Sequence, residues 1–335
     1  MANPVLVTGG AGYVGSHIVV DLAAAGYDPL IIDNFATSSP AVVPRLRRIT
    51  DQPIPCIAGD VRDRVAMQRL FAEHEVAAVV HCAGLKAVGE GETKPLAYYD
   101  NNVGGAVALL EAMTAADVKS LVFSSSAAVY GQPDKNPVTE DSPLRPASVY
   151  GRTKRMIEQI LEDLSSSDAR WRIGVLRYFN PAGAHSSAAI GEAPTAPPNN
   201  LVPLLAQAAA TGAPAIDVLG DDWSTDDGTG VRDYVHVMDL ASGHVAAMAH
   251  LERAPGLTTL NLGTGRGHSV LEVVAAFERA CGKPIARRIA SRRPGDVAIC
   301  YADPSRSRQL LGWRPTRDLD AICADAWRWQ TSGHR

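Results

Sequence analysis

Tyr150 and Lys154 lie four residues apart in the segment Ser-Val-Tyr-Gly-Arg-Thr-Lys, which spans residues 148–154. On a helix, side chains at this spacing share one face, one turn apart. A free tyrosine has a pKa of about 10 and is a weak base at neutral pH, but a lysine ammonium held beside it favours the phenolate. The spacing therefore predicts a tyrosine that exchanges protons with a substrate hydroxyl, although Tyr-x-x-x-Lys also arises by chance on many helices.

A glycine-rich segment at residues 8–15, Thr-Gly-Gly-Ala-Gly-Tyr-Val-Gly, follows the first predicted strand and opens a predicted helix. Gly9, Gly12 and Gly15 give the spacing Gly-x-x-Gly-x-x-Gly, which permits a tight turn and close approach of the backbone to a pyrophosphate. The helix N-terminus adds N–H donors and the positive end of the helix dipole. Because strand and helix flank the glycines as such a site requires, the segment predicts dinucleotide binding.

Two aspartates follow later strands of the same series. Asp33 ends the second predicted strand, about 20 residues past the glycines, where a carboxylate binds the adenosine ribose and repels a 2′-phosphate. This favours NAD over NADP; the alternative for Asp33 is a turn residue before Asn34. Asp60 follows the third strand and is expected to face the adenine, or otherwise to cap the helix after it.

The first half of the chain alternates short apolar runs with helical stretches. Strands are predicted at residues 4–8, 29–33, 54–58, 77–82, 119–124 and 172–177, and a helix at 13–25. Apolar runs of this length, separated by helices, predict an α/β fold with a Rossmann-type doubly wound parallel sheet.

After Asn180 the composition changes. Residues 181–233 are rich in Gly, Pro, Ala and Asp and predict loops with one helix at 201–211, whereas a helix at 236–251 and a strand at 258–262 are expected to return to the sheet. We therefore expect an NAD-binding domain over 1–180, joined by 236–263, and a smaller C-terminal substrate-binding lobe over 181–335.

Bulk composition excludes several classes of protein. The chain has 335 residues, 46% of them hydrophobic, and a net charge of -4, so no basic field indicates nucleic acid. Its five cysteines are scattered, and its histidines show no metal-ligand spacing, so we expect no metal and a reducing, cytoplasmic location. We identify no signal peptide, and no apolar run reaches the ~20 residues that a membrane helix needs.

Taken together, the glycine segment, Tyr150 and Lys154 resemble the extended short-chain dehydrogenases/reductases. Longer segments narrow the resemblance to the UDP-glucose 4-epimerases. These segments are residues 83–90, 98–102, 123–126, 177–181, 198–201, 227–234 and 293–296, with the regions around Trp313 and Trp327. The resemblance covers essentially the whole chain.

The resemblance implies interconversion of UDP-glucose and UDP-galactose with no net oxidation, so that NAD stays bound. NAD+ takes a hydride from C4 of the sugar and returns it to the other face after the 4-keto intermediate has rotated. Tyr150 removes and restores the 4-OH proton, and Ser126 hydrogen-bonds the C4 oxygen. Lys154 contacts the nicotinamide ribose and lowers the pKa of Tyr150.

The resemblance also implies two sets of binding residues. NAD is expected to contact Gly9, Gly12, Tyr13, Val14, Gly15, Asp33, Asn34, Thr37, Ser38, Asp60, Val61, Cys82, Ala83, Gly84, Lys86, Asn101, Ser126, Tyr150, Lys154 and Phe179. The UDP-hexose is expected to contact Lys86, Ser126, Tyr150, Asn180, Asn200, Leu201, Val218, Arg232, Arg293, Asp296 and Cys300. Arg232 and Arg293 suit the diphosphate because guanidinium groups match phosphate oxygens, while Asp296 suits the uridine ribose.

Three positions depart from the family pattern. Cys82 replaces a common phenylalanine, and Ala128 replaces a threonine that offers the sugar one hydrogen bond. Cys300 occupies a position where family members carry either tyrosine or a small residue, near the 2-substituent of the sugar. A cysteine leaves room for an N-acetyl group, so UDP-GlcNAc and UDP-GalNAc are expected substrates as well, unless Cys300 is an ordinary buried cysteine.

Other functions of the same fold remain open to different degrees. A nucleotide-sugar 4,6-dehydratase needs an acid after Ser126, where this chain has Ala127 and Ala128. A UDP-pentose or UDP-uronate 4-epimerase is closer, and a non-catalytic NAD-sensing protein is expected to have lost Tyr150 or Lys154. The family implies a homodimer joined through helices near residues 95–115 and 148–168.

Overall fold

The computed structural model describes residues 4–194, 198–212, 215–293 and 295–334. Residues 195–197, in a Pro-rich stretch, and Pro294 of the Arg-Pro-Gly-Asp motif lie outside the described residues. Within the described ranges, every helix is too short or too polar to cross a membrane.

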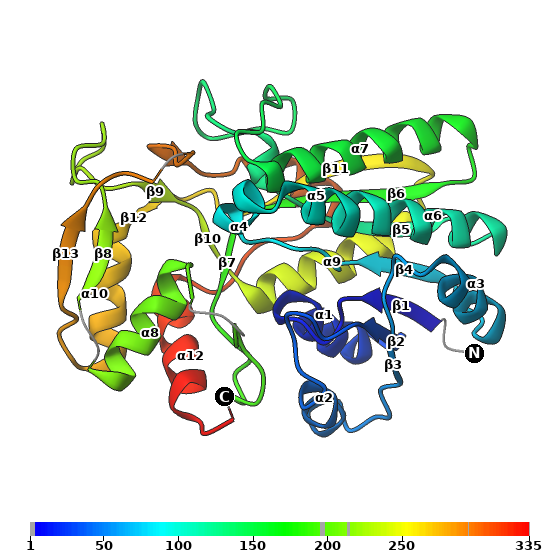
Figure 1. Ribbon diagram of the computed structural model, residues 1–335, viewed down its shortest axis with the longest axis horizontal. Helices are drawn as coiled ribbons and strands as arrows, with labels where there is room; N and C mark the ends of the chain where they lie inside the picture. The colour runs from blue at the N-terminus through cyan, green and yellow to red at the C-terminus, as the bar shows by residue number, and fades with distance from the viewer. Residues whose placement is uncertain (1–3, 195–197, 213–214, 294, 335) are drawn as a thin grey trace.

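A seven-stranded parallel sheet forms the larger part of the molecule (Figure 1). Its strands are β1 (Pro4–Thr8), β2 (Asp28–Asp33), β3 (Cys56–Ala58), β4 (Ala78–His81), β5 (Ser120–Ser126), β6 (Arg172–Tyr178) and β11 (Gly256–Leu262). They lie in the order β11-β6-β5-β4-β1-β2-β3. The predicted Rossmann-type sheet is confirmed, and the carboxyl ends of its strands share one edge, where ligands bind in such folds.

Helices cover both faces of this sheet (Figure 1). On one face, α1 (Tyr13–Ala24), α2 (Val42–Thr50) and α9 (Val237–Leu251) pack on Val5, Val7 and their neighbours. On the other, α3 (Arg64–Glu73), α6 (Gly105–Ala115) and α7 (Val149–Ser167) pack on Leu6 and its neighbours. Side chains alternate between the faces of a strand, so a continuous apolar run such as β1 supplies both cores.

Short elements link β4 to α6 and β5 to α7. Helices α4 (Val88–Thr93) and α5 (Pro95–Tyr98) lead into a π-helix at Tyr99–Gly104, and a 3₁₀ turn at Ala127–Val129 follows β5. A π-helix is rare and often marks a functional site.

A second, smaller group of elements is built mainly from the C-terminal half. It contains α8 (Leu201–Thr211), α10 (Val270–Cys281) and α12 (Leu319–Thr331), which share one apolar core. Short strands accompany them: β8 (Ile216–Leu219) with β13 (Arg287–Ala290), β7 (Asn180–Ala182) with β10 (Tyr234–His236), and β9 (Val231–Arg232) between β12 (His268–Ser269) and β14 (Ile299–Cys300). The sequence predicted only loops and α8 for residues 181–233, because strands of two to four residues carry no readable alternation.

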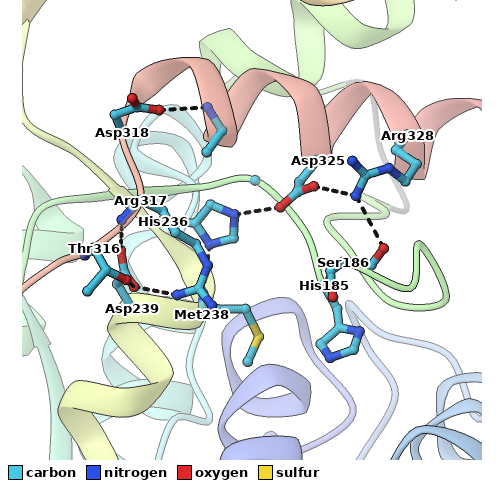
Figure 2. Close-up of polar contacts among 12 residues, drawn as sticks. His185, Ser186, His236, Met238, Asp239, Thr316, Arg317, Asp318, Asp325 and Arg328 are labelled. Carbon is cyan, nitrogen blue, oxygen red and sulfur yellow. Dashed lines mark hydrogen bonds and ion pairs between the residues drawn. The ribbon is translucent and has the colours of Figure 1, made fainter.

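Polar contacts fasten the C-terminal segment to the start of α9 (Figure 2). Asp239 is buried and accepts hydrogen bonds from the N–H groups of Thr316 and Arg317, at 3.0 and 2.9 Å. His236 Nε2 lies 3.2 Å from Asp325 Oδ2 on α12. Helix α9 packs on α1 and on β6, and α11 (Ser305–Leu311) packs on α9 and β11, so α9 joins the sheet to the smaller group of elements.

Candidate active site

The glycine turn after β1 is closely packed at the carboxyl edge of the sheet. Gly9 has φ +68, and a Cβ there would lie 2.9 Å from Ala83 Cα. A Cβ at Gly15 would lie 2.2 Å from the carbonyl oxygen of Gly9. Helix α1 begins after Gly12 with no side-chain cap, so the N–H groups of its first turn, from Tyr13 onward, are left for an anion. These residues fit the pyrophosphate of a dinucleotide.

Asp33 joins the glycine turn to the end of β2. It is 7% exposed. Its Oδ2 accepts a hydrogen bond from Ala11 N at 3.0 Å, and its Oδ1 accepts from Phe35 N at 2.9 Å and from Ser38 Oγ at 2.8 Å. A carboxylate has about four acceptor sites, so Oδ2 retains capacity for a ribose hydroxyl. Asp33 therefore fits the ribose end of NAD and is more than a turn residue.

Asp60, the residue predicted to face the adenine, is held by its neighbours. Asn34 Nδ2 donates to its Oδ2 at 2.9 Å, and Arg62 donates to both of its oxygens at 3.0 and 2.7 Å. Hydrogen bonding by Arg62 holds the pKa of Asp60 well below its usual range. The helix-cap interpretation of Asp60 is wrong, because Asp63 caps α3 by accepting from the N–H groups of Val65 and Ala66.

Tyr150 and Lys154 both lie on α7, which Ser148 caps by accepting a hydrogen bond from Gly151 N at 3.1 Å. Lys154 Nζ lies 5.9 Å from the centre of the Tyr150 ring and 4.8 Å from that of Phe123. The two side chains are almost fully buried, with exposed fractions of 9% for Tyr150 and 4% for Lys154. The predicted helix and shared face are confirmed.

Burial governs the ionisation of both groups. It lowers the pKa of Lys154 to about 8, while Cys82 and Glu158 act in the opposite direction. It also raises the pKa of Tyr150, against the lowering effect of hydrogen bonding by Ser126. The protein side chains alone therefore do not produce the expected depression of the Tyr150 pKa, because loss of solvent outweighs the hydrogen bond from Ser126.

Ser126 ends β5 at the same edge of the sheet. Its Oγ accepts a hydrogen bond from Ala128 N at 3.1 Å and caps the 3₁₀ turn. Together with its effect on the Tyr150 pKa, this places the hydroxyl beside the phenol. The phenol and the hydroxyl can therefore both hydrogen-bond one bound oxygen atom.

The segment after β4 lies against this group. A Cβ on Gly84 would lie 3.8 Å from Lys154 Nζ, and Cys82 Sγ lies 3.2 Å from Ser124 Oγ. Asn102, which the sequence reasoning missed, fixes this segment: its Oδ1 accepts from Leu85 N at 2.8 Å and its Nδ2 donates to Leu85 O at 3.0 Å. Asn101, the predicted NAD ligand, donates to Asn102 in the π-helix at 3.0 Å. The two adjacent asparagines were the sequence feature from which the role of Asn102 could have been predicted.

Glu192 was also missed. Its Oε1 accepts from Lys86 Nζ at 2.8 Å and from Asn200 Nδ2 at 3.1 Å. Lys86 Nζ lies 5.8 Å from the centre of the Tyr13 ring, at the start of α1. Glu192 thus links two predicted ligand residues, Lys86 and Asn200, and Lys86 lies close to the glycine turn. In the sequence, only its position in a Pro-rich loop distinguished Glu192.

The residues predicted for the UDP end lie on the smaller group of elements. Arg232 on β9 is paired in register with Cys300 on β14, and Arg293 Nη2 donates to Asp296 Oδ1 at 2.8 Å. Asn180 is exposed on β7, and Asn200 and Leu201 begin α8.

Four predicted ligands need separate comment. The side chains of Val61 and Val218 are buried. Phe179 follows β6 and packs with Cys300 in one apolar cluster. Thr37 lies in the exposed loop after β2.

Two further observations concern ligands. Within the described ranges, no three His, Cys, Asp or Glu side chains are grouped to hold a metal ion.

A cavity of about 530 Å³ lies apart from the predicted site, between α10 and the start of α12, with Arg266, Arg279 and Arg317 in its wall. None of its lining residues belongs to the predicted NAD or sugar set.

Known proteins resemble the chain along its whole length. Residues 5–263 match the model of the NAD dependent epimerase/dehydratase family. A UDP-glucose 4-epimerase of Bacillus subtilis is 51% identical over 328 residues, covering 98% of this chain and 97% of that protein.

Two solved structures extend the comparison. The UDP-glucose 4-epimerase of Bifidobacterium longum, in complex with NAD+ and UDP, has a TM-score of 0.96 and 48% identity, covering 98% of each chain. The UDP-glucose-4-epimerase of Stenotrophomonas maltophila, with NAD and formylated UDP-arabinopyranose, has a TM-score of 0.97 and 49% identity, covering 99% of each chain. The chain is therefore a member of the NAD dependent epimerase/dehydratase family.

Proposed function

We propose that this chain is an enzyme that interconverts UDP-glucose and UDP-galactose with NAD as its resident cofactor. The observation that carries the proposal is the burial of Tyr150 and Lys154 beside Ser126, at the sheet edge that also holds the glycine turn and Asp33. The Bacillus subtilis relative and the Bifidobacterium longum structure, which match nearly the whole chain, are named as UDP-glucose 4-epimerases.

The protein residues act on one proton of the sugar. When bound, NAD supplies the hydride acceptor and donor at C4. Tyr150 takes the 4-OH proton as the C4 hydrogen leaves with its electron pair, and returns it when the carbonyl is reduced. Ser126 hydrogen-bonds the C4 oxygen, and the Lys154 ammonium offsets the negative charge on Tyr150. The proton and the electron pair are both restored, so the cycle needs no other reactant.

We assign the binding residues as the sequence indicates. Residues 1–180, with 236–263, form the NAD-binding domain, and 181–335 supply the lobe for the UDP-sugar. Arg232 and Arg293 bind the diphosphate, because both lie on the smaller group of elements and a guanidinium suits phosphate oxygens. In this assignment Arg293 exchanges part of its contact with Asp296 for the ligand.

The enzyme also accepts UDP-GlcNAc and UDP-GalNAc. This extension rests on Cys300, which is buried in the cluster that contains Phe179, Ala127 and Tyr130. Burial raises the pKa of the Cys300 thiol to about 11, so it is a small neutral group at physiological pH. A tyrosine would fill space that a cysteine leaves to the 2-substituent.

A second candidate function is epimerisation of UDP-pentoses. It is favoured by one observation, the formylated UDP-arabinopyranose bound to the Stenotrophomonas maltophila structure. A pentose lacks C6 but presents the same C4 hydroxyl to Tyr150.

The test is product analysis of the purified protein on a panel of UDP-hexoses, UDP-N-acetylhexosamines and UDP-pentoses without added NAD. Interconversion of UDP-galactose and UDP-glucose, with nicotinamide recovered from the denatured protein, is expected. Turnover of pentoses alone would replace the first function by the second. Protein that holds no nicotinamide and turns over none of the sugars, even with NAD added, would overturn the proposal.

We further propose a homodimer in the cytoplasm. Leu96 on α5 is 82% exposed and Met156 on α7 is also exposed, on the helices expected to meet a second copy. All five cysteines are free thiols, as a reducing compartment keeps them. Light scattering should give the mass of two chains for the wild type and of one chain for a Leu96→Asp/Met156→Glu variant.

A further inference from the structure

The position of Lys154 depends on one main-chain group. Its Nζ donates a hydrogen bond to the carbonyl oxygen of Ser124 at 2.7 Å. No other hydrogen bond of this ammonium occurs among the described residues. The position of the Ser124 carbonyl therefore sets the position of the Lys154 ammonium beside Tyr150.

Strand pairing holds Ser124 on one side only. Strand β4 ends at His81, which pairs with Phe123, so β5 runs three residues past its neighbour. Beyond that point β5 is paired only with β6, where Ser124 faces Leu176. The Ser124 carbonyl thus lies beyond the last residue pair between β5 and β4. The side chain of Ser124 provides the other contact that holds this residue in place.

That anchor is His244 on α9, which is 0% exposed. Its Nδ1 lies 2.9 Å from the carbonyl oxygen of Leu240, which can only accept, so Nδ1 carries the proton. Its Nε2, 2.9 Å from Ser124 Oγ, is therefore the acceptor, and the serine hydroxyl donates to it. Ser124 Oγ is then free to accept from the Cys82 thiol at 3.2 Å.

We infer that His244 is a positioning residue for Lys154, acting through Ser124. Helix α9 packs on β5 and β6, and at its N-terminus His236, which precedes the helix, and Asp239 bind the C-terminal segment. The expected effect on turnover rests on the proposed function, whereas the hydrogen bonds that join His244, Ser124 and Lys154 do not depend on it. Other ionisable groups near the ammonium are Cys82, Glu158 and His81. Tyr178 lies beside Tyr150 and the Ser124 hydroxyl.

The test compares His244→Leu, which removes the acceptor, with His244→Gln, whose amide oxygen reaches about as far as Nε2. The leucine variant should lower kcat about tenfold and leave KM for UDP-galactose unchanged, since a small displacement of a catalytic group is costly. The glutamine variant should recover most of that loss. Ser124→Ala, which keeps the carbonyl, should match the leucine variant, and the double variant should lose no more than either single variant.

A readout independent of turnover is the titration of Tyr150. The phenolate absorbance is followed with pH for each protein, and the absorbance of the same protein carrying Tyr150→Phe is subtracted. Lys154 and Tyr150 titrate as a coupled pair, and an ammonium held close to the phenol lets part of the phenolate form at lower pH. His244→Leu and Ser124→Ala should therefore move the Tyr150 midpoint to higher pH, because they displace the ammonium. His17→Leu is the matched control: its Nδ1 also bonds a carbonyl four residues back, that of Tyr13 at 2.7 Å, but its Nε2 has no partner in the described structure. It should not move the midpoint.

An unchanged midpoint in both His244→Leu and Ser124→Ala would overturn the inference, as would losses in kcat that multiply in the double variant. If His244→Leu does not fold, Ser124→Ala and His244→Gln carry the comparison. A wild-type protein with no epimerase turnover would overturn the proposed function instead, and the titration would still decide the role of His244.

Discussion

Glu158 and Arg177 form a buried two-point ion pair behind the helix turn that carries Lys154. Arg177 Nε donates to Glu158 Oε1 at 3.0 Å, and Nη2 donates to Oε2 at 2.8 Å. Ser125 Oγ also donates to Oε1, at 2.6 Å. Glu158 lies two turns beyond Tyr150 on α7, and Arg177 lies on β6, so the ion pair fixes the helix against the sheet.

Glu158→Gln should lower the free energy of unfolding by about 3–5 kcal/mol, because removal of one partner leaves an uncompensated buried charge on Arg177. Urea denaturation measures the loss. Glu73→Gln, which breaks the exposed pair with Arg69 at 2.6 Å, is the control and should leave the urea midpoint unchanged. Equal midpoints for both variants would show that the buried pair does not anchor α7.

Tyr150→Phe should keep NAD and UDP-sugar binding and lose turnover by about 10²–10⁴-fold, the usual contribution of a general acid–base group. The change removes one hydroxyl from a buried ring and leaves its packing with Tyr98 and Val149 intact. Calorimetric binding of UDP and the steady-state rate on UDP-galactose check the two parts. Turnover within a factor of a few of the wild type would exclude Tyr150 as the proton carrier.

Cys300→Tyr should abolish turnover of UDP-GlcNAc and UDP-GalNAc while UDP-glucose and UDP-galactose are still converted, because the larger ring takes the space of the N-acetyl group. Cys300→Ser, which keeps the size of the side chain, is the control and should retain both activities. The measurement is kcat/KM on each sugar. Equal losses on hexose and N-acetylhexosamine would contradict this role of Cys300.

Acidification below about pH 6.5 should destabilise the protein. Burial lowers the pKa of His17 and His81 to about 3 and that of His244 to about 4, against about 6.5 in the unfolded chain. Between these values the unfolded chain binds more protons than the folded one, so stability present at pH 7 is lost as the pH falls. Each histidine contributes roughly 2 kcal/mol to the difference between pH 7 and pH 5.

Urea midpoints between pH 7.5 and pH 5 check this expectation. His244→Gln removes one titrating group and should show a shallower fall than the wild type. A wild-type midpoint that stays constant over this range would contradict the neutral, buried state of the three histidines.

The site divides into parts that the sequence could and could not predict. The sheet, the glycine turn and the shared face of Tyr150 and Lys154 were predictable, because each follows from a local pattern: apolar runs between helices, glycines at fixed spacing, and side chains four apart on a helix. The Asp60 helix-cap alternative failed because Asp63, three residues on, competes for the same N–H groups.

The sequence alone therefore determined which residue types meet at the sheet edge, and through them the family and the chemistry. Tertiary structure decided how those residues are held and charged. His244 reaches Ser124 across 120 residues, and Glu192 reaches Lys86 across 106. Such contacts depend on packing between distant segments, which no local spacing records. The pKa of Tyr150 likewise rises because folding removes the phenol from water, so burial and not the lysine four residues on sets its direction.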